Sequence, residues 1–256
     1  MKNVIAVWKN VGQTPLEVIK VFKQTSPTYS REKISYAGRL DPMAEGILLL
    51  LIGDENKKRK EYQNLKKIYE SEIIFGIRTD TYDALGMIVG VHSQKLPEKK
   101  DVEDQFGKMI GKRHQQYPPY SSKPVNGKPL YWWARQGKLS EIEIPEKEIE
   151  IYSVKILSFS TISSEYLLED VLRRIVLVSG NFRQDEISQK WKETLIGNAQ
   201  FLAIRIEIAC SSGTYIRDIA NQLGGDLGVG AFANTITRTR IGSFTKKDCV
   251  PYIEAF

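Results

Sequence analysis

The 256-residue sequence contains few residues of the kinds that build metal sites, disulfide frameworks or membrane spans. It has two cysteines, Cys210 and Cys249, and two histidines, His92 and His114, which lie far from one another in the sequence. Because this spacing is not that of metal ligands, no metal site is expected, and the thiols fit a reducing compartment. No apolar run approaches the roughly 20 residues of a membrane-spanning helix, and the N-terminus lacks a signal-peptide pattern. We therefore expect a cytoplasmic protein with no membrane association.

The excess of positive charge is modest. There are 37 Lys and Arg residues against 31 Asp and Glu residues, giving a formal net charge of +6. This excess is compatible with a polyanionic partner, but an ordinary soluble protein can carry it as well. The length suffices for a hydrophobic core without disulfides. Charge alone therefore leaves the partner open.

The apolar periodicity predicts a mixture of strands and helices. Strands are expected at residues 4–8, 69–77, 149–159, 201–209 and 235–244, with residues 86–91 as the hairpin partner of residues 69–77. Helices are expected at residues 97–110 and 215–223, and another opens at Thr14, the predicted N-cap, with Leu16, Ile19 and Phe22 on one face. This irregular alternation favours an α+β domain around a mixed, mainly antiparallel sheet flanked by helices.

The most informative segment is YAGRLDPMAEG at residues 36–46, which runs directly into the apolar residues 47–52. Gly38 lets the backbone turn or pass close to a ligand, and Pro42 stiffens the exit from the loop. The short apolar run is typical of a buried strand. Asp41 is thus expected on a constrained loop that leads into the core, either as a turn residue or as a rigidly held, partly desolvated acid.

This segment resembles the catalytic motif of the TruB family of tRNA pseudouridine synthases. Three further segments resemble family motifs in the same order, namely residues 78–86 (RTDTYDALG), residues 118–137 and residues 212–217 (SGTYIR). The chain is identified as a member of this family over about residues 2–244. The resemblance implies the pseudouridine synthase fold and an isomerase that converts a T-loop uridine of tRNA, position 55, to pseudouridine after base flipping.

The resemblance also implies a catalytic set of Asp41, Tyr69 and Arg217. Asp41 would act as a nucleophile at C1′ or C6, or would abstract a proton from the ribose. Arg217 would pair with Asp41 and offset the cost of desolvating the carboxylate. Tyr69 would stack on the target base and help to move the C5 proton. Since the isomerisation needs no redox group, metal or activated phosphate, no cofactor is expected.

Further residues are implied to bind RNA. They are Tyr36, Arg39, Lys9, Lys123, Lys128, Tyr131, Arg135 and Arg238. Tyr36 stands where the family has a histidine, so the details of loop recognition are expected to differ. Lys9 belongs to a partial match to the N-terminal family signature and would support either the catalytic loop or the RNA backbone. The Pro-rich residues 117–129 are expected to form an exposed, irregular loop that meets the ligand.

Residues 165–196 predict a helical hairpin inserted into the family pattern. Leu168, Val171, Leu172, Ile175 and Val176 repeat with helical spacing, and after a break at residues 179–181 so do Ile187, Trp191 and Leu195. We favour a surface embellishment. Alternatively, Arg173, Arg174, Lys190 and Lys192 add an RNA contact or a partner surface.

The predicted organisation is one catalytic domain over residues 1–256 without the C-terminal PUA domain of many relatives. We therefore expect tRNA, through its T-arm, as the partner, with no guide RNA and no obligate protein partner, and a monomer. Two alternatives stay open. The same fold could act on another RNA, or the protein could be an RNA-binding or RNA-folding protein with weak catalysis.

Overall fold

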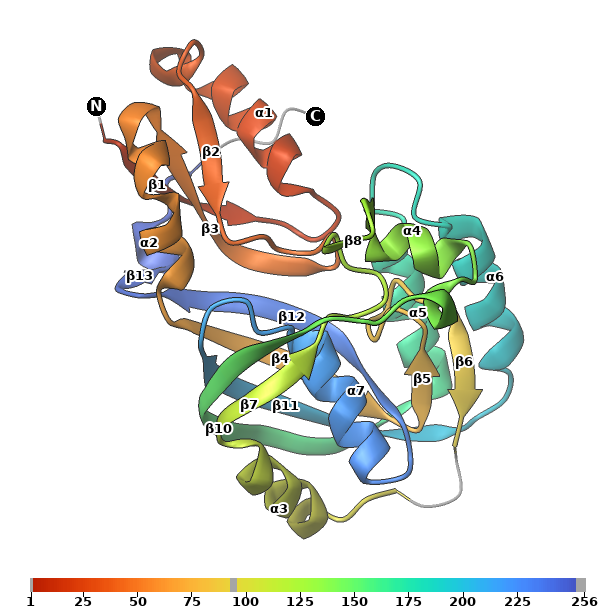
Figure 1. The fold of residues 1–256 in the computed structure, drawn as a ribbon. Coiled ribbons are helices and arrows are strands. Elements are labelled where there is room, and N and C mark those ends of the chain that lie inside the picture. Colours follow the sequence, from red (N-terminus) through yellow and green to blue (C-terminus); the bar gives the residue numbers. More distant parts are fainter. Residues whose placement is uncertain (1, 93–95, 252–256) are drawn as a thin grey trace.

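The computed structural model describes residues 2–92 and 96–251. A nine-stranded sheet runs through the molecule (Figure 1). Its strands are β1 (Val4–Lys9), β2 (Ile34–Ala37), β3 (Ala44–Ile52), β4 (Lys67–Phe75), β7 (Gly111–Gln116), β10 (Glu146–Ser163), β11 (Gln200–Cys210), β12 (Ala231–Ile241) and β13 (Phe244–Thr245). The order is β1-β3-β12-β4-β11-β10-β7, with β2 beside β3 and β13 beside β12. The β3–β12 pair is parallel and the others are antiparallel, which confirms the expected mixed, mainly antiparallel sheet.

Two short ribbons lie outside this sheet. One pairs β5 (Ile77–Thr79) with β6 (Ile88–Val91), and the other pairs β8 (Pro124–Val125) with β9 (Lys128–Pro129). The prediction that residues 86–91 pair with the strand at residues 69–77 is therefore wrong for most of that strand. The reason is Gly76, whose φ of 93° ends β4 and turns the chain into the separate ribbon. The expected irregular loop at residues 117–129 likewise contains the small β8–β9 ribbon.

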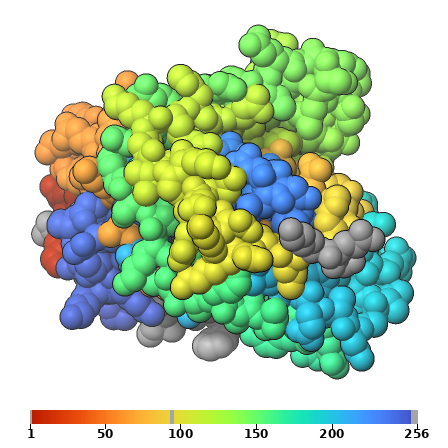
Figure 2. Space-filling model, turned by 90° about the horizontal axis from the view of Figure 1, so that it is seen from below, coloured from red at the N-terminus to blue at the C-terminus, as the bar shows by residue number. Residues whose placement is uncertain are grey.

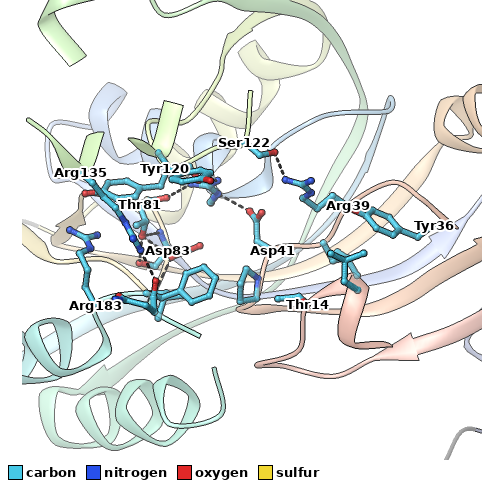
Figure 3. A pocket seen from close by; sticks show the side chains of 18 residues that line it. Thr14, Tyr36, Arg39, Asp41, Thr81, Asp83, Tyr120, Ser122, Arg135 and Arg183 are labelled. Atoms are coloured by element: carbon cyan, nitrogen blue, oxygen red, sulfur yellow. Dashed lines mark hydrogen bonds and ion pairs between the residues drawn. The ribbon is translucent and has the colours of Figure 1, made fainter. Parts of the chain in front are cut away.

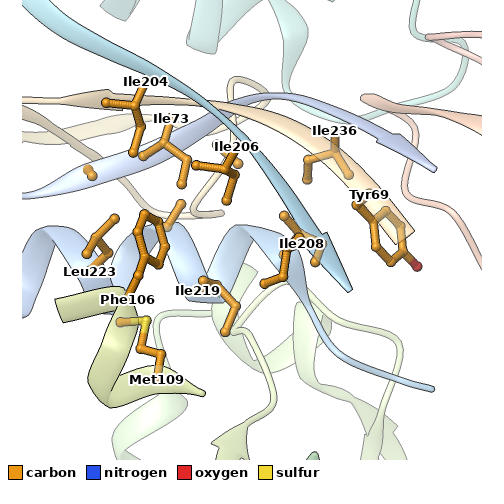
Figure 4. Packing of buried hydrophobic residues seen from close by; sticks show 14 of the residues in the cluster. Tyr69, Ile73, Phe106, Met109, Ile204, Ile206, Ile208, Ile219, Leu223 and Ile236 are labelled. Atoms are coloured by element: carbon orange, nitrogen blue, oxygen red, sulfur yellow. The ribbon is translucent and has the colours of Figure 1, made fainter. Parts of the chain in front are cut away.

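Helices flank the sheet and the loops that connect its strands. They are α1 (Pro15–Thr25), α2 (Arg59–Asn64), α3 (Lys99–Met109), α4 (Leu130–Arg135), α5 (Ser164–Ile175), α6 (Gln184–Thr194) and α7 (Ile216–Asp226). Helices α3 and α7 pack on one face, where Phe106 and Leu223 meet Ile73, Ile204 and other inward residues of β4 and β11 (Figure 4). Seen from below, α3 lies on the surface and the segment containing α4 stands out at one edge (Figure 2).

Helices α5 and α6 cover the opposite face, in the segment for which the sequence predicts a hairpin. Successive strand residues point to opposite faces, so Ile74 packs under these helices with Phe232 while Ile73 faces the other way. Trp191 is fully buried here, and its indole donates a hydrogen bond of 3.0 Å to the Gly86 carbonyl. The hairpin is therefore part of the core, and the favoured interpretation as a surface embellishment is wrong.

The inward stripes of two helices differ from the predicted ones. In α5, Val171 and Ile175 are buried as predicted, but Leu167 is buried as well, and Val176, directly after the helix, is 80% exposed. In α1, Val18 and Phe22 are buried, but Leu16 faces outward. Both helices carry two overlapping apolar stripes, and the sheet beneath selects one of them. The N-cap at Thr14 is confirmed, because its hydroxyl accepts a hydrogen bond from the Glu17 amide.

Over the described ranges, no helix combines the length and apolar character needed to cross a membrane. In the same ranges, no group of three or more His, Cys, Asp or Glu side chains is placed to hold a metal ion.

Candidate active site

The loop that carries Asp41 connects β2 to β3 and lies against β12. The far end of β3 pairs with β2, whereas its first residues, 44–46, pair with β12. Gly46 makes this close approach possible: its φ is 116°, and a Cβ there would lie 2.3 Å from the Arg238 carbonyl oxygen. The loop is consequently held over the end of β12, at the edge of the core.

Arg238 holds the loop from below. Its buried guanidinium donates hydrogen bonds to the carbonyls of Ile47 (2.8 Å) and Gly38 (3.1 Å), with a longer contact to that of Arg39 (3.4 Å). The Arg238 side chain is buried and its donors are taken up by the loop, but it also lines a pocket beside Asp41, so its expected contact with RNA stays a prediction. Its role here is to position the backbone on either side of Asp41.

Lys9 holds the other end of the loop. Its fully buried ammonium group donates to the carbonyls of Asn10 (2.9 Å) and Ala44. Burial lowers the pKa of Lys9 to about 7, against the opposing influence of Asp41. Of the two expected roles, support of the catalytic loop fits this geometry. These contacts give no support to a direct contact of Lys9 with RNA, which stays a prediction.

Arg217 fixes the Asp41 carboxylate. Its Nε donates to Asp41 Oδ2 at 2.9 Å, and its two terminal nitrogens donate to the carbonyls of Thr81 (2.7 Å) and Tyr120 (3.1 Å). Burial works to lower the pKa of Arg217, but the carboxylates of Asp41 and Asp83 outweigh it, so the pKa lies above its usual value. The Arg217 side chain is 3% exposed and that of Asp41 29%. Asp41 is thus held by a permanent charge while its carboxylate still reaches the solvent side.

The segment at residues 78–86 positions the Thr81 carbonyl. The buried Asp83 carboxylate accepts hydrogen bonds from the Thr81 hydroxyl (2.7 Å) and the Leu85 amide (3.0 Å), closing a tight turn. Burial raises the pKa of Asp83, chiefly against the attraction of Arg217. A Cβ at Gly86 would lie 2.4 Å from the Thr81 hydroxyl, so the turn requires glycine there. This motif supports Arg217, and its residues Thr81, Asp83 and Leu85 also line a pocket beside Asp41.

Two pockets meet at Asp41. The first, which we call the Tyr69 pocket, has a volume of about 360 Å³ and is also lined by Tyr69, Arg217, Arg238 and Ile236. Tyr69 lies at the edge of the core cluster with its hydroxyl directed away from Ile236 (Figure 4). Burial raises the pKa of Tyr69, so the phenol stays protonated at neutral pH. The structure thus brings the three expected catalytic residues to one pocket.

Two lysines of the Tyr69 pocket were missed by the sequence reasoning. Lys67 and Lys147 both line it, and burial lowers the pKa of each to about 8. The Lys147 ammonium lies over the rings of Tyr215 (4.4 Å) and Tyr117 (5.1 Å). Lys67 lies two residues before Tyr69 in the sequence, and this closeness to a catalytic candidate could have identified it as a pocket residue. Lys147 lies in a strand far from any motif and gave none.

The second pocket, which we call the Tyr120 pocket, has a volume of about 460 Å³ and lies on the other side of Asp41. Figure 3 shows Asp41 between Arg39 on one side and Tyr120, Arg135 and Arg183 on the other. The pocket also has an aromatic lining, contributed by Tyr36, Tyr120, Tyr131 and Phe182.

Four of the expected RNA-binding residues line the Tyr120 pocket, namely Tyr36, Arg39, Tyr131 and Arg135. The Arg39 guanidinium donates to the Ser122 hydroxyl, which ties the loop that carries Asp41 to the segment at residues 117–137. Lys123 lies 5.1 Å over the ring of Tyr117, a residue of the Tyr69 pocket. Lys128 lies over Trp132 and lines neither pocket.

The α5–α6 loop, residues 176–183, contributes pocket residues that the sequence reasoning did not single out. Asn181, Phe182 and Arg183 line the Tyr120 pocket. The hairpin charges chosen from the sequence lie elsewhere: Arg174 is buried against Asp170 (2.7 Å) and Arg173 pairs with the same carboxylate (2.6 Å). Lys190 and Lys192 line neither pocket. No periodicity or charge pattern pointed to the loop, because its position depends on how the hairpin docks.

Solved structures with a similar architecture share little sequence with this chain. A crystal structure of a Cbf5-Nop10-Gar1 complex matches with a TM-score of 0.55 and 18% identity, over 95% of this chain and 50% of that one. A structure of an H/ACA RNP bound to a substrate RNA containing 2′-deoxyuridine matches with a TM-score of 0.53, again at 18% identity, over 95% and 48%. The chain spans about half the length of these proteins, and at this identity the likeness shows the fold alone.

The sequence comparisons identify the family. Residues 26–170 match the model of the TruB family pseudouridylate synthase N-terminal domain. The tRNA pseudouridine synthase B of Listeria monocytogenes serovar 1/2a is 30% identical over 254 residues, 99% of this chain and 71% of the relative. That of Clostridium acetobutylicum is 30% identical over 98% of this chain and 71% of its own length. This chain belongs to the TruB family, which confirms the resemblance and the expected class of enzyme, an isomerase that forms pseudouridine in RNA.

Proposed function

We propose that this protein converts a T-loop uridine of tRNA, position 55, to pseudouridine, with Asp41 as the reacting carboxylate. The observation that carries the proposal is the Asp41–Arg217 pair at the junction of two pockets. The names of the bacterial relatives support tRNA as the substrate. We further propose that the reaction takes place in the cytoplasm.

The reaction detaches uracil from C1′ at N1 and rejoins it through C5, so the C5 proton is lost and N1 gains one. Asp41 serves this isomerisation as an ionised carboxylate, whether it attacks carbon or abstracts a ribose proton. The Arg217 guanidinium donates a hydrogen bond of 2.9 Å to this carboxylate and fixes its orientation in a partly closed site. Tyr69 lines the same pocket, so its ring can contact the base, and its phenol can relay the C5 proton by releasing its own proton as it accepts the new one.

The two pockets suit an RNA loop from which a base has been turned out. In the Tyr69 pocket, Ile236 and Tyr69 offer apolar and aromatic contacts to the uracil ring, and Lys147 offers positive charge to the backbone. The Lys67 ammonium donates to the carbonyls of Gln63 and Leu65 and so supports the pocket wall. The segment at residues 117–137 carries Lys123, Lys128, Tyr131 and Arg135 toward the T-arm. We propose that this catalytic domain, with the α5–α6 hairpin as an insertion, acts as a monomer without a guide RNA.

The proposal is tested by mapping pseudouridine with mass spectrometry in a transcribed tRNA after incubation with the protein and no added cofactor. We expect one new pseudouridine, at position 55 of the T-loop, and none in a matched transcript that carries cytidine there. Measurable tRNA binding without product, or modification only at another position, would overturn the tRNA assignment and favour a different RNA substrate for the same fold.

A further inference from the structure

The α5–α6 loop reaches the active site. Asn181, Phe182 and Arg183 line the Tyr120 pocket together with Asp41, although they follow Asp41 in the sequence by well over a hundred residues. Figure 3 shows Arg183 beside Tyr120 and Arg135 on the side of the pocket that lies across from Arg39. A segment outside the family motifs therefore forms one wall of the space next to the reacting carboxylate.

This wall is held by segments from several parts of the chain. Arg183 pairs with Asp80 at 2.8 Å, and Arg135 donates a hydrogen bond of 2.7 Å to the Asn181 carbonyl. The Ser179 hydroxyl donates to the Glu17 carboxylate at the start of α1. Arg183 has a φ of 65°, a conformation that non-glycine residues adopt only when their surroundings impose it. The wall is thus preformed.

The wall offers flat, uncharged surface to a ligand. The Arg183 guanidinium forms an ion pair with Asp80 and lies 4.5 Å from the centre of the Tyr120 ring, so its positive charge is neutralised within the protein. Phe182 is half-buried, packing on one side against the α5–α6 core cluster while lining the pocket. An aromatic face next to neutralised charge favours stacking of a nucleobase over binding of a phosphate.

We propose that Phe182 stacks on an unstacked base next to the target uridine, and that the α5–α6 loop thereby selects the RNA by its flanking nucleotide. This inference depends on the proposed function, which places the target base in the Tyr69 pocket. Because Asp41 lines both pockets, a nucleotide in the Tyr120 pocket lies next to the one that reacts.

The test combines a protein change with an RNA change. Pseudouridine formation and RNA affinity are measured for wild type, Phe182→Ala, Phe182→Tyr and, as a control on the exposed side of α6, Lys192→Ala. The substrates are a T-arm stem-loop and the same RNA with an abasic nucleotide on the 5′ or the 3′ side of the target. We expect Phe182→Ala to raise KM about tenfold on the intact RNA with kcat little changed. Phe182→Tyr keeps the aromatic ring and is expected to recover most of the lost affinity, and Lys192→Ala is expected to match wild type.

With one of the two abasic RNAs, wild type and Phe182→Ala are expected to have the same KM, because the base that Phe182 contacts is missing. An unchanged KM on intact RNA would overturn the inference. So would a defect that persists on both abasic RNAs, since that pattern indicates a structural effect. Failure of the proposed function is distinguishable, because wild type itself would then make no pseudouridine; in that case the same comparison of affinities decides the role of Phe182.

Discussion

At the scale of single residues, the planar guanidinium of Arg217 joins the Asp41 carboxylate to its surroundings. One nitrogen contacts Asp41, and the others contact the carbonyls of Thr81 and Tyr120, so three separate segments converge on one side chain. An ammonium group has the same charge but cannot present donors in this fixed plane. Replacing Arg217 by lysine therefore keeps the positive charge and removes the planar arrangement of donors, so the two contributions can be measured separately.

Arg217→Lys is expected to lower kcat by about 10²-fold while RNA affinity stays close to that of wild type, because the charge remains but the carboxylate loses its fixed orientation. Single-turnover rates and RNA binding isotherms measure the two quantities separately. The matched control is Arg205→Lys, at an exposed pair with Glu70, which is expected to leave both unchanged. A kcat like that of wild type in Arg217→Lys would show that orientation by the fork is unimportant.

The sequence identified the residues grouped around Asp41, but it did not show which way the side chains of Lys9 and Arg238 point. Asp41, Tyr69 and Arg217 could be named because they lie within or beside recognisable motifs. Arg238 was named as an RNA contact, and Lys9 as support for either the catalytic loop or the RNA backbone. Both side chains donate hydrogen bonds to backbone carbonyls of distant segments. Every residue has such a carbonyl, so the residue types do not reveal these partners. The three-dimensional structure was therefore needed to decide whether a Lys or Arg side chain points toward the ligand or toward the protein backbone.

At the scale of secondary structure elements, the α5–α6 hairpin joins the core to the active site. Its inner stripe packs on the sheet through Leu167, Val171 and Trp191, while its loop lines the Tyr120 pocket. Helical spacing was sufficient to predict two helices. It did not show which of two adjacent stripes faces inward, because that choice depends on the strand surface beneath.

Trp191→Ala is expected to lower the free energy of unfolding by about 3–5 kcal/mol, because it opens a cavity in the core and removes the hydrogen bond to Gly86. Lys192→Ala, on the exposed side of the same helix, is expected to change it by less than about 0.5 kcal/mol. Urea unfolding followed by circular dichroism gives both values. If the hairpin were only a surface embellishment, Trp191→Ala would leave the main transition in place and the two variants would behave alike.

At the scale of the whole molecule, the fold brings four separated motifs to one junction. The loop at residues 36–46, the turn at residues 78–86, the segment at residues 117–137 and the start of α7 all meet around Asp41 and Arg217. The periodicity predicted most of the strands and the fold class. The strand order could not be predicted in this way, because the parallel β3–β12 pair joins segments from opposite ends of the chain.

The central claim is that Asp41 carries out the isomerisation and that the rest of the site holds it in place. It is tested most directly by the time course of pseudouridine formation in tRNA with wild type and Asp41→Asn, with RNA affinity measured on the same samples. The variant is expected to bind tRNA as wild type does and to lose at least about 10³-fold in turnover. Full turnover by Asp41→Asn at the same uridine would contradict the account.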